Sequence, residues 1–235
     1  MNNPLDLSEK GRGGKSFDRR LFVQFLAFGG IDQESESRLV RDLERFPFPT
    51  VLYSDINDYR GAGLLAMSET PDFFVTELRR FLCGSSFAEL VPKPEYTMFG
   101  RTYSIGYEND LEETLISGPV QKIFNPELKW AIWYPLRRAK TFETLTSEEQ
   151  RAVLAEHGKI GFQFGGAGYA KDIRLASHGL DKNDNDFVIG ILGSKLYPLS
   201  ALVERMRKTQ QTSRYLESLG PFFIGRKLFS TEKGT

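Results

Sequence analysis

The stretch Leu128-Lys-Trp-Ala-Ile-Trp-Tyr134 decides how the second half of this chain folds. It is dominated by apolar and aromatic residues, a composition that predicts a buried β-strand. Residues 147–157 follow, with acidic residues at the start and apolar residues three and four apart, and this pattern predicts a helix. The segments that come next are typical of strand, strand, helix and strand in turn: residues 172–176, 186–191, 199–208 and 222–226. The predicted order of the second half is therefore β-α-β-β-α-β.

The first half shows the same order. Its six segments are residues 20–28, 33–46, 50–55, 63–67, 71–82 and 96–103. The closing strands of both halves share an apolar-Gly-Arg pattern, at Phe99-Gly-Arg101 and Ile224-Gly-Arg226. A repeated β-α-β-β-α-β order predicts an α+β fold of tandem ferredoxin-like (βαββαβ) halves. The two antiparallel sheets can pair face to face or edge to edge, which protects their edge strands.

We divide the chain into three parts on this basis. Residues 1–16 are polar, Gly-rich and charged, and we expect a flexible N-terminal arm. Residues 17–115 form the N-terminal half, which we expect to be a scaffold, and residues 116–235 form the C-terminal half. Both histidines of the chain lie in the C-terminal half, so any imidazole ligand must come from there.

The composition excludes several classes of protein. Hydrophobic residues make up 40% and charged residues 26% of 235 residues, as in soluble globular proteins. Because 31 basic and 31 acidic side chains balance, the chain lacks the charge of a nucleic-acid-binding protein. A single cysteine, Cys83, rules out an intramolecular disulfide and fits a reducing compartment. The sequence holds no run of about 18 apolar residues, so we expect no membrane span. Residues 1–15 lack the apolar core of a signal peptide. We therefore expect a cytoplasmic protein.

His157 is the strongest candidate for a metal ligand. It lies on the apolar face of the predicted helix with Val153 and Leu154, and Gly158 after it predicts the end of that helix. One interpretation is a buried or capping histidine, and the other is an axial iron ligand. A lone imidazole suits a haem-type metalloporphyrin better than zinc, which needs three or four clustered ligands. His178 lies in a turn-like segment, where we expect a structural role.

Tyr134 and the basic residues near it could serve an anionic cofactor. Tyr134 ends the apolar strand, and Pro135 is expected to stop regular pairing there. Arg137 and Arg138 are either solvated or bind carboxylates through charge-assisted hydrogen bonds. Residues 206–215 form a second basic and hydroxyl-rich segment at a predicted helix end.

Together these residues resemble the chlorite dismutase family of haem proteins, particularly its coproheme decarboxylase branch. The segments that carry the resemblance are Tyr134-Pro-Leu-Arg-Arg138, Glu148-Glu149 ahead of Glu156-His-Gly158, Gly179-Leu-Asp181 with Asp186-Phe-Val188, Met206-Arg207, Ser213-Arg-Tyr215 and Pro221-Phe-Phe-Ile-Gly-Arg226. The resemblance implies that the tandem halves form an α+β barrel in a homopentamer, with haem as the cofactor.

The resemblance also implies roles for individual residues. His157 corresponds to the proximal iron ligand, and Tyr134 to the tyrosine that becomes a radical during coproheme decarboxylation. Arg138, Arg207 and Thr212 fall where that branch holds the propionates. The implied reaction uses hydrogen peroxide to convert two propionates of coproheme to vinyl groups, giving haem b.

The distal side departs from the family pattern. Chlorite-degrading members carry an arginine on the strand before Gly-Leu-Asp, and many decarboxylases carry glutamine. Counting back from Gly179 places Asp172 there, and Arg174 lies two residues on, which puts it on the same face of a strand. If Arg174 faces the iron, a cation would hold anionic chlorite. If Asp172 faces it, the carboxylate would repel an anion and act as a base toward peroxide. Phe142 stands where the family commonly has tryptophan.

Four functions stay open on these grounds. They are a coproheme decarboxylase, a chlorite dismutase or haem peroxidase, a haem-binding or haem-transfer protein without turnover, and a tandem ferredoxin-like oligomer without a cofactor.

Overall fold

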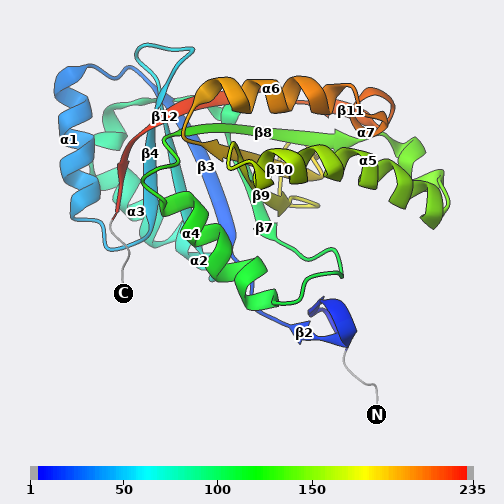
Figure 1. Ribbon diagram of the computed structural model, residues 1–235. Helices are drawn as coiled ribbons and strands as arrows, with labels where there is room; N and C mark the ends of the chain where they lie inside the picture. The colour runs from blue at the N-terminus through cyan, green and yellow to red at the C-terminus, as the bar shows by residue number, and fades with distance from the viewer. Residues whose placement is uncertain (1–4, 232–235) are drawn as a thin grey trace.

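Eight antiparallel strands close into a barrel in the computed structural model, which describes residues 5–231 (Figure 1). The N-terminal half contributes β3 (Phe22–Gly29), β4 (Thr50–Asp55), β5 (Ala62–Ser68) and β7 (Met98–Thr102). The C-terminal half contributes β8 (Trp130–Arg138), β9 (Lys171–Ala176), β10 (Phe187–Gly193) and β12 (Phe223–Ser230).

Both halves have the same lateral strand order. The first half pairs its strands as β7-β3-β5-β4, and the second as β12-β8-β10-β9. The two sheets join edge to edge, because β12 pairs with β4 and β7 pairs with β9. These two junctions close the ring and leave neither half with a free edge. The prediction of tandem ferredoxin-like halves that form an α+β barrel is therefore confirmed.

Shorter strands extend this framework. β6 (Val91–Pro92) pairs with β3, and β11 (Leu216–Leu219) pairs with β8. Part of the expected N-terminal arm forms a hairpin of β1 (Glu9–Lys10) and β2 (Ser16–Phe17), while residues 1–4 of that arm lie outside the described residues. An ion pair of 2.7 Å between Glu9 Oε1 and Arg101 ties this hairpin to the end of β7.

Helices cover the outer faces of the barrel on two sides (Figure 1). Three of them pack on the N-terminal half: α1 (Gln33–Glu44), α2 (Asp72–Val75) and α3 (Glu77–Gly84). α4 (Gly118–Phe124), preceded by a π-helical turn at Glu113–Ser117, links the halves, so the boundary placed between residues 115 and 116 falls inside this helical connector. Three more belong to the C-terminal half: α5 (Ser147–Gly166), α6 (Leu196–Arg207) and α7 (Gln210–Arg214). No helix within residues 5–231 combines the length and the apolar character that crossing a bilayer requires.

The end expected for α5 was wrong. The helix begins as predicted, with a capping box in which Thr146 and Glu149 bond reciprocally. It then continues through Gly158 to Gly166, so His157 lies within the helix and Gly158 is not its C-cap. Ile160 and the buried Phe164 extend the apolar face of the helix. Their packing against the sheet outweighs the cost of about 1 kcal/mol for a glycine inside a helix.

Pro135 does not stop β8, contrary to the prediction. It lies opposite Val188, within the pairing between β8 and β10. The next carbonyl, that of Leu136, faces β10 and accepts from the Asp186 N–H at 3.0 Å. Strand alternation therefore turns the nitrogen of Pro135 to the opposite side, where the Gly220 N–H bonds its carbonyl at 2.9 Å. The missing donor of the proline costs no bond to β10.

The register of β8 divides its side chains between two cores. Trp133 points into the barrel, where it packs with Phe25, Tyr53 and Phe223. Tyr134 points outward, into the cluster formed with α5 and α6. Because side chains alternate along a strand, Tyr134 lies on the outer, helix-covered face of the sheet while Trp133 lies inside the barrel.

Candidate functional site

The predicted catalytic residues share the outer face of the C-terminal sheet. Tyr134 of β8 lies opposite Ile189 of β10, and Ile189 lies opposite Arg174 of β9. Directly opposed residues on antiparallel strands project to the same side. Asp172 is two residues before Arg174 and therefore points the same way. The structure places all three residues on the face against which α5 and α6 pack.

Asp172 and Arg174 form an ion pair with each other. The Arg174 Nε lies 3.2 Å from the Asp172 Oδ2, and Lys122 of α4 lies 4.0 Å from the other carboxylate oxygen. Both side chains of the pair are about half exposed, so water screens the attraction. The sequence left open which of the two faces the site. In the structure both do, and their charges offset each other.

Tyr134 is buried and stacked. Its ring lies 4.5 Å from that of Phe222, centroid to centroid, with 22° between the planes. The guanidinium of Arg207 lies 5.7 Å from the centroid of Phe222, within cation–π range. Burial raises the pKa of Tyr134, the nearby Asp172 carboxylate raises it further, and Arg207 opposes both. The phenol is therefore protonated at neutral pH.

His157 is half-buried on the side of α5 that carries Val153 and Phe164. Its Nδ1 lies 3.1 Å from the Thr209 Oγ1, which comes from the junction of α6 and α7. Burial lowers the pKa of His157 and the adjacent Glu156 opposes this shift, so the ring is neutral at neutral pH. Among residues 5–231 no hydrogen bond reaches the Nε2.

The helix leaves space beside His157. A Cβ added at Gly158 would meet no atom within 4 Å, and one at Gly161 would meet only the Met206 Cε, at 3.5 Å. Gly161 follows His157 by four residues and lies next to it on the helix surface. The glycines therefore leave the backbone of α5 uncovered beside His157, with Met206 as the nearest side chain at Gly161.

Arg138 ends β8, and Thr212 lies in α7, which leads into the strand that pairs with Arg138 at Leu216. The Arg138 guanidinium lies over Phe142, 4.3 Å from its centroid, and 4.9 Å from the centroid of Phe187. Its Nε is buried and has no hydrogen-bond partner within the described residues. Buried donors are nearly always paired, so a carboxylate of a bound molecule is a fitting partner. Thr212 is half-buried in α7, three residues after Thr209.

Three residues of the region were missed in the sequence. Thr209 was only part of a hydroxyl-rich segment, and Phe222 only part of a strand. Tyr103 follows β7 and packs against Phe187 at 5.6 Å between centroids. Burial raises the pKa of Tyr103, and Arg174 and Arg138 oppose the shift, which places this phenol near both guanidiniums. Local sequence patterns carry no signal for such contacts.

His178 lies at the edge of these contacts, against the same Phe187 ring that Arg138 and Tyr103 meet. Its side chain is more than half exposed, and its Nδ1 lies 3.3 Å from the Asp186 Oδ1. The ring packs edge-on against Phe187 at 5.1 Å. The structure thus keeps the two histidines in different environments.

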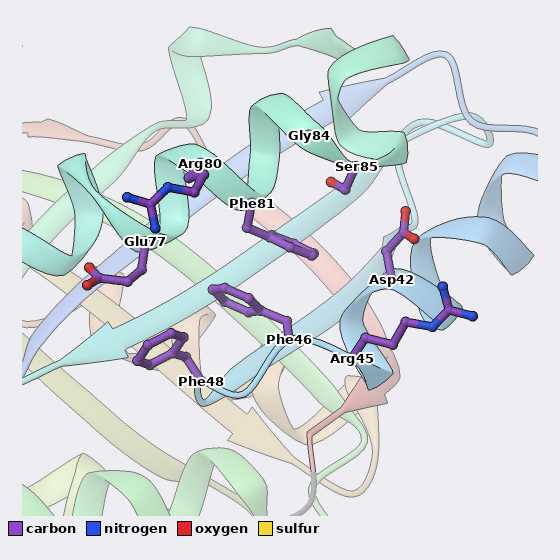
Figure 2. A pocket seen from close by; sticks show the side chains of 9 residues that line it. All are labelled: Asp42, Arg45, Phe46, Phe48, Glu77, Arg80, Phe81, Gly84 and Ser85. Atoms are coloured by element: carbon purple, nitrogen blue, oxygen red, sulfur yellow. The ribbon is translucent and has the colours of Figure 1, made fainter.

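A separate cavity of about 360 Å³ lies between α1 and α3 in the N-terminal half. Figure 2 shows that Phe46, Phe48 and Phe81 form its floor and that charged side chains surround them. The rings of Phe46 and Phe81 stack on each other at 4.2 Å. None of the predicted site residues lines this cavity, and we assign no chemistry to it.

The residues on the outer face of the C-terminal half fit the metalloporphyrin expected from the sequence. A neutral imidazole with a free Nε2 suits an iron ion, and the unpaired donor of Arg138 suits a carboxylate. Two ferredoxin-like units closed into one barrel, with this imidazole on a helix of the second unit, define the class of tandem α+β barrel proteins.

The sequence profile described as chlorite dismutase matches residues 66–228. The chain therefore belongs to the chlorite dismutase family.

Solved structures show the same fold. TA0507, a candidate chlorite dismutase, has a TM-score of 0.72 at 13% identity, over 90% of this chain and 96% of that chain. A novel heme-binding protein from Thermus thermophilus has a TM-score of 0.67 at 18% identity, over 91% and 92% of the two chains. A variant of the chlorite dismutase from Candidatus Nitrospira defluvii has a TM-score of 0.65 at 18% identity, over 90% and 92%. These identities are low, so the likeness speaks for the fold alone.

Proposed function

We propose that this protein binds an iron porphyrin and is a hydrogen-peroxide-dependent coproheme decarboxylase that produces haem b. The observation that carries the proposal is the buried phenol of Tyr134, which stacks on Phe222 with the Arg207 guanidinium beside that ring. A phenol that can lose a hydrogen atom thus lies near a cation that can hold a carboxylate. Membership of the chlorite dismutase family and the fold shared with a heme-binding protein support this interpretation.

Four residues would hold the porphyrin. The Nε2 of His157 would bind the iron, and Arg138, Arg207 and Thr212 would bind the propionates. When bound, the iron porphyrin supplies the redox chemistry. The protein orients each propionate and keeps water away from Tyr134, whose side chain is buried.

Tyr134 would first lose an electron and a proton to the oxidising equivalents that hydrogen peroxide supplies. The phenoxyl so formed would remove a hydrogen atom from a propionate methylene group and become a phenol again. The propionate then loses carbon dioxide and becomes a vinyl group, giving up two electrons and one proton in all. Hydrogen peroxide takes up the two electrons with two protons and becomes two molecules of water. Two such rounds turn coproheme into haem b. Because burial keeps Tyr134 protonated, its oxidation would release a proton together with the electron.

The paired charges of Asp172 and Arg174, on the same face as Tyr134, favour an uncharged oxidant over an anionic one. Arg174 is engaged by Asp172, so the face carries no unpaired cation from this pair to attract an anion. Hydrogen peroxide is uncharged, whereas chlorite is an anion.

Chlorite dismutation is the second candidate, because Arg174 lies on the same face as Tyr134. It would require Arg174 to leave Asp172 and meet the substrate. A haem-binding or haem-transfer protein would need only His157 and the propionate-binding residues. The family resemblance also predicts a homopentamer, which light scattering of the purified protein would test.

The deciding experiment loads the protein with ferric coproheme under anaerobic conditions and titrates it with hydrogen peroxide. Mass spectrometry of the extracted porphyrin should show stepwise loss of carbon dioxide and two hydrogen atoms, first from one propionate and then from a second. Bleaching of tightly bound coproheme without mass loss would contradict the decarboxylase. Chlorite, added in a parallel titration, would then test the second candidate through release of dioxygen.

A further inference from the structure

We propose that Thr209 is a positioning residue that holds His157 as its Nδ1–H tautomer and so directs the free electron pair of Nε2 toward the iron. This inference rests on the proposed porphyrin binding. Thr209 is 2% exposed, and its Oγ1 has two neighbours: the His157 Nδ1 at 3.1 Å and the Met206 carbonyl oxygen at 2.7 Å.

Counting hydrogens assigns the tautomer. The Thr209 hydroxyl has one hydrogen to donate, and the Met206 carbonyl can only accept, so both short contacts are hydrogen bonds only when the hydroxyl hydrogen points to that carbonyl. The Thr209 Oγ1 is then left as an acceptor toward His157, and the Nδ1 must carry a hydrogen for the contact of 3.1 Å to be a hydrogen bond. A neutral imidazole with hydrogen on Nδ1 has its electron pair on Nε2.

A second contact fixes the same junction. The Glu156 Oε2 accepts from the backbone N–H of Gln210 at 3.0 Å. Glu156 and His157 are consecutive in α5, and Thr209 and Gln210 are consecutive where α7 begins. Two adjacent residues of α5 therefore bond two adjacent residues at the N-terminal end of α7. This arrangement holds the ring in one orientation.

The junction also carries the predicted propionate ligands. α6 ends at Arg207, and α7 contains Thr212. The hydroxyl of Ser213 bonds the Thr209 carbonyl at 2.8 Å, which keeps α7 in place behind Thr209. The orientation of the imidazole is thereby coupled to the positions of the groups that would hold the porphyrin edge.

The chemical nature of the acceptor has a consequence for the iron. A carboxylate acceptor pulls the Nδ1 hydrogen strongly and makes the imidazole a richer electron donor. The Thr209 hydroxyl is neutral and is already polarised toward Met206, so it fixes the tautomer and leaves the imidazole a moderate donor.

The test compares Thr209→Val, which removes the hydroxyl at similar volume, with Thr209→Ser, which keeps it. Long-range ¹H–¹⁵N NMR spectra of ¹⁵N-histidine-labelled protein without porphyrin report the tautomer of each ring. We expect Nδ1–H for His157 in the wild-type protein and in Thr209→Ser, and a shift toward Nε2–H in Thr209→Val. His178 has no contact with Thr209 and serves as an internal reference whose signals stay unchanged.

Titration with ferric haem provides the second readout. Loss of the hydroxyl should weaken haem binding about 10- to 100-fold in Thr209→Val, the range typical for partners of metal-bound histidines, and Thr209→Ser should restore it. An Nε2–H tautomer of His157 in the wild-type protein, or the same tautomer in both variants, would overturn the proposal. If Thr209→Val does not fold, the wild-type spectrum still tests the proposal, because an Nε2–H tautomer of His157 in that spectrum contradicts it. The NMR result involves no decarboxylation, so its failure is distinct from a failure of the proposed function.

Discussion

The ring of Phe222 stacks on the ring of Tyr134 at 4.5 Å, and this contact follows from the register of two strands. Phe223 lies opposite Trp133 in the pairing of β12 with β8. One step along this antiparallel register brings residues 222 and 134 opposite each other. Because side chains alternate, Phe223 and Trp133 point into the barrel while Phe222 and Tyr134 meet on the outer face. The packing of the barrel interior therefore determines the position of the candidate catalytic phenol.

Replacing Tyr134 with phenylalanine should abolish decarboxylation and leave coproheme binding within about 3-fold of wild type, since only the hydroxyl is lost. Peroxide titration with mass spectrometry measures the first effect, and absorbance titration measures the second. Tyr53→Phe is the matched control. Tyr53 is buried inside the barrel, so this variant should keep full turnover. Full activity of the Tyr134 variant would remove this residue from the mechanism.

Replacing His157 with alanine should abolish defined axial ligation of haem, because no other histidine lies on α5. The absorbance and resonance Raman spectra of the haem-loaded protein report the ligand. His178→Ala is the control, since His178 is exposed and pairs with Asp186. Identical haem spectra for wild type and His157→Ala would refute the ligand assignment.

Replacing Asp172 with asparagine should release Arg174 and strengthen the binding of small anions such as fluoride to the haem-loaded protein. A gained charge-assisted contact of about 1.4 kcal/mol corresponds to about a tenfold lower Kd. The double variant with Arg174→Gln should return to the wild-type Kd, because the released cation is then absent. Equal fluoride affinity in wild type and Asp172→Asn would mean that the ion pair does not govern anion binding.

Tyr134 should make the protein sensitive to alkaline pH. Its pKa is raised in the folded state by burial, so its stabilising contribution is complete below the unfolded pKa of about 10 and is lost as pH rises above that value. The free energy of unfolding of the porphyrin-free protein should therefore fall above about pH 10. Urea titrations across this alkaline range should show a smaller fall for Tyr134→Phe than for wild type. A parallel fall in both proteins would show that Tyr134 contributes nothing to this dependence.

Replacing Gly190 with alanine should destabilise the barrel by about 1–3 kcal/mol through overpacking. A Cβ at Gly190 would lie 2.5 Å from the ring of Trp133, at the pairing of β8 with β10. Gly166→Ala is the matched control, because a Cβ there meets no atom within 4 Å. Chemical denaturation measures both, and equal stability of the two variants would contradict the packing argument.

Much of the fold was predictable because its signals are local. The presence of β8, predicted at residues 128–134 and observed at Trp130–Arg138, and the start of α5 at Ser147 follow from side-chain patterns only a few residues long. The end of α5 was not predictable in this way. Gly158 is a stop signal on its own, but Ile160 and Phe164 find apolar partners on the sheet that keep the helix going. Pro135 was misjudged for a similar reason, since its effect depends on which side of β8 its nitrogen faces.

The sequence by itself determined the repeated βαββαβ order, the single candidate imidazole at His157 and the family resemblance. Tertiary structure alone decided that the two sheets join edge to edge, that Asp172 and Arg174 pair with each other, and that Thr209 is the partner of His157. The physical reason is distance along the chain. Helix and strand periodicity is encoded within a few neighbouring residues, whereas the bond between His157 and Thr209 joins residues 52 positions apart. Such a bond exists only once the packing of α5, α6 and α7 has brought its two atoms within reach.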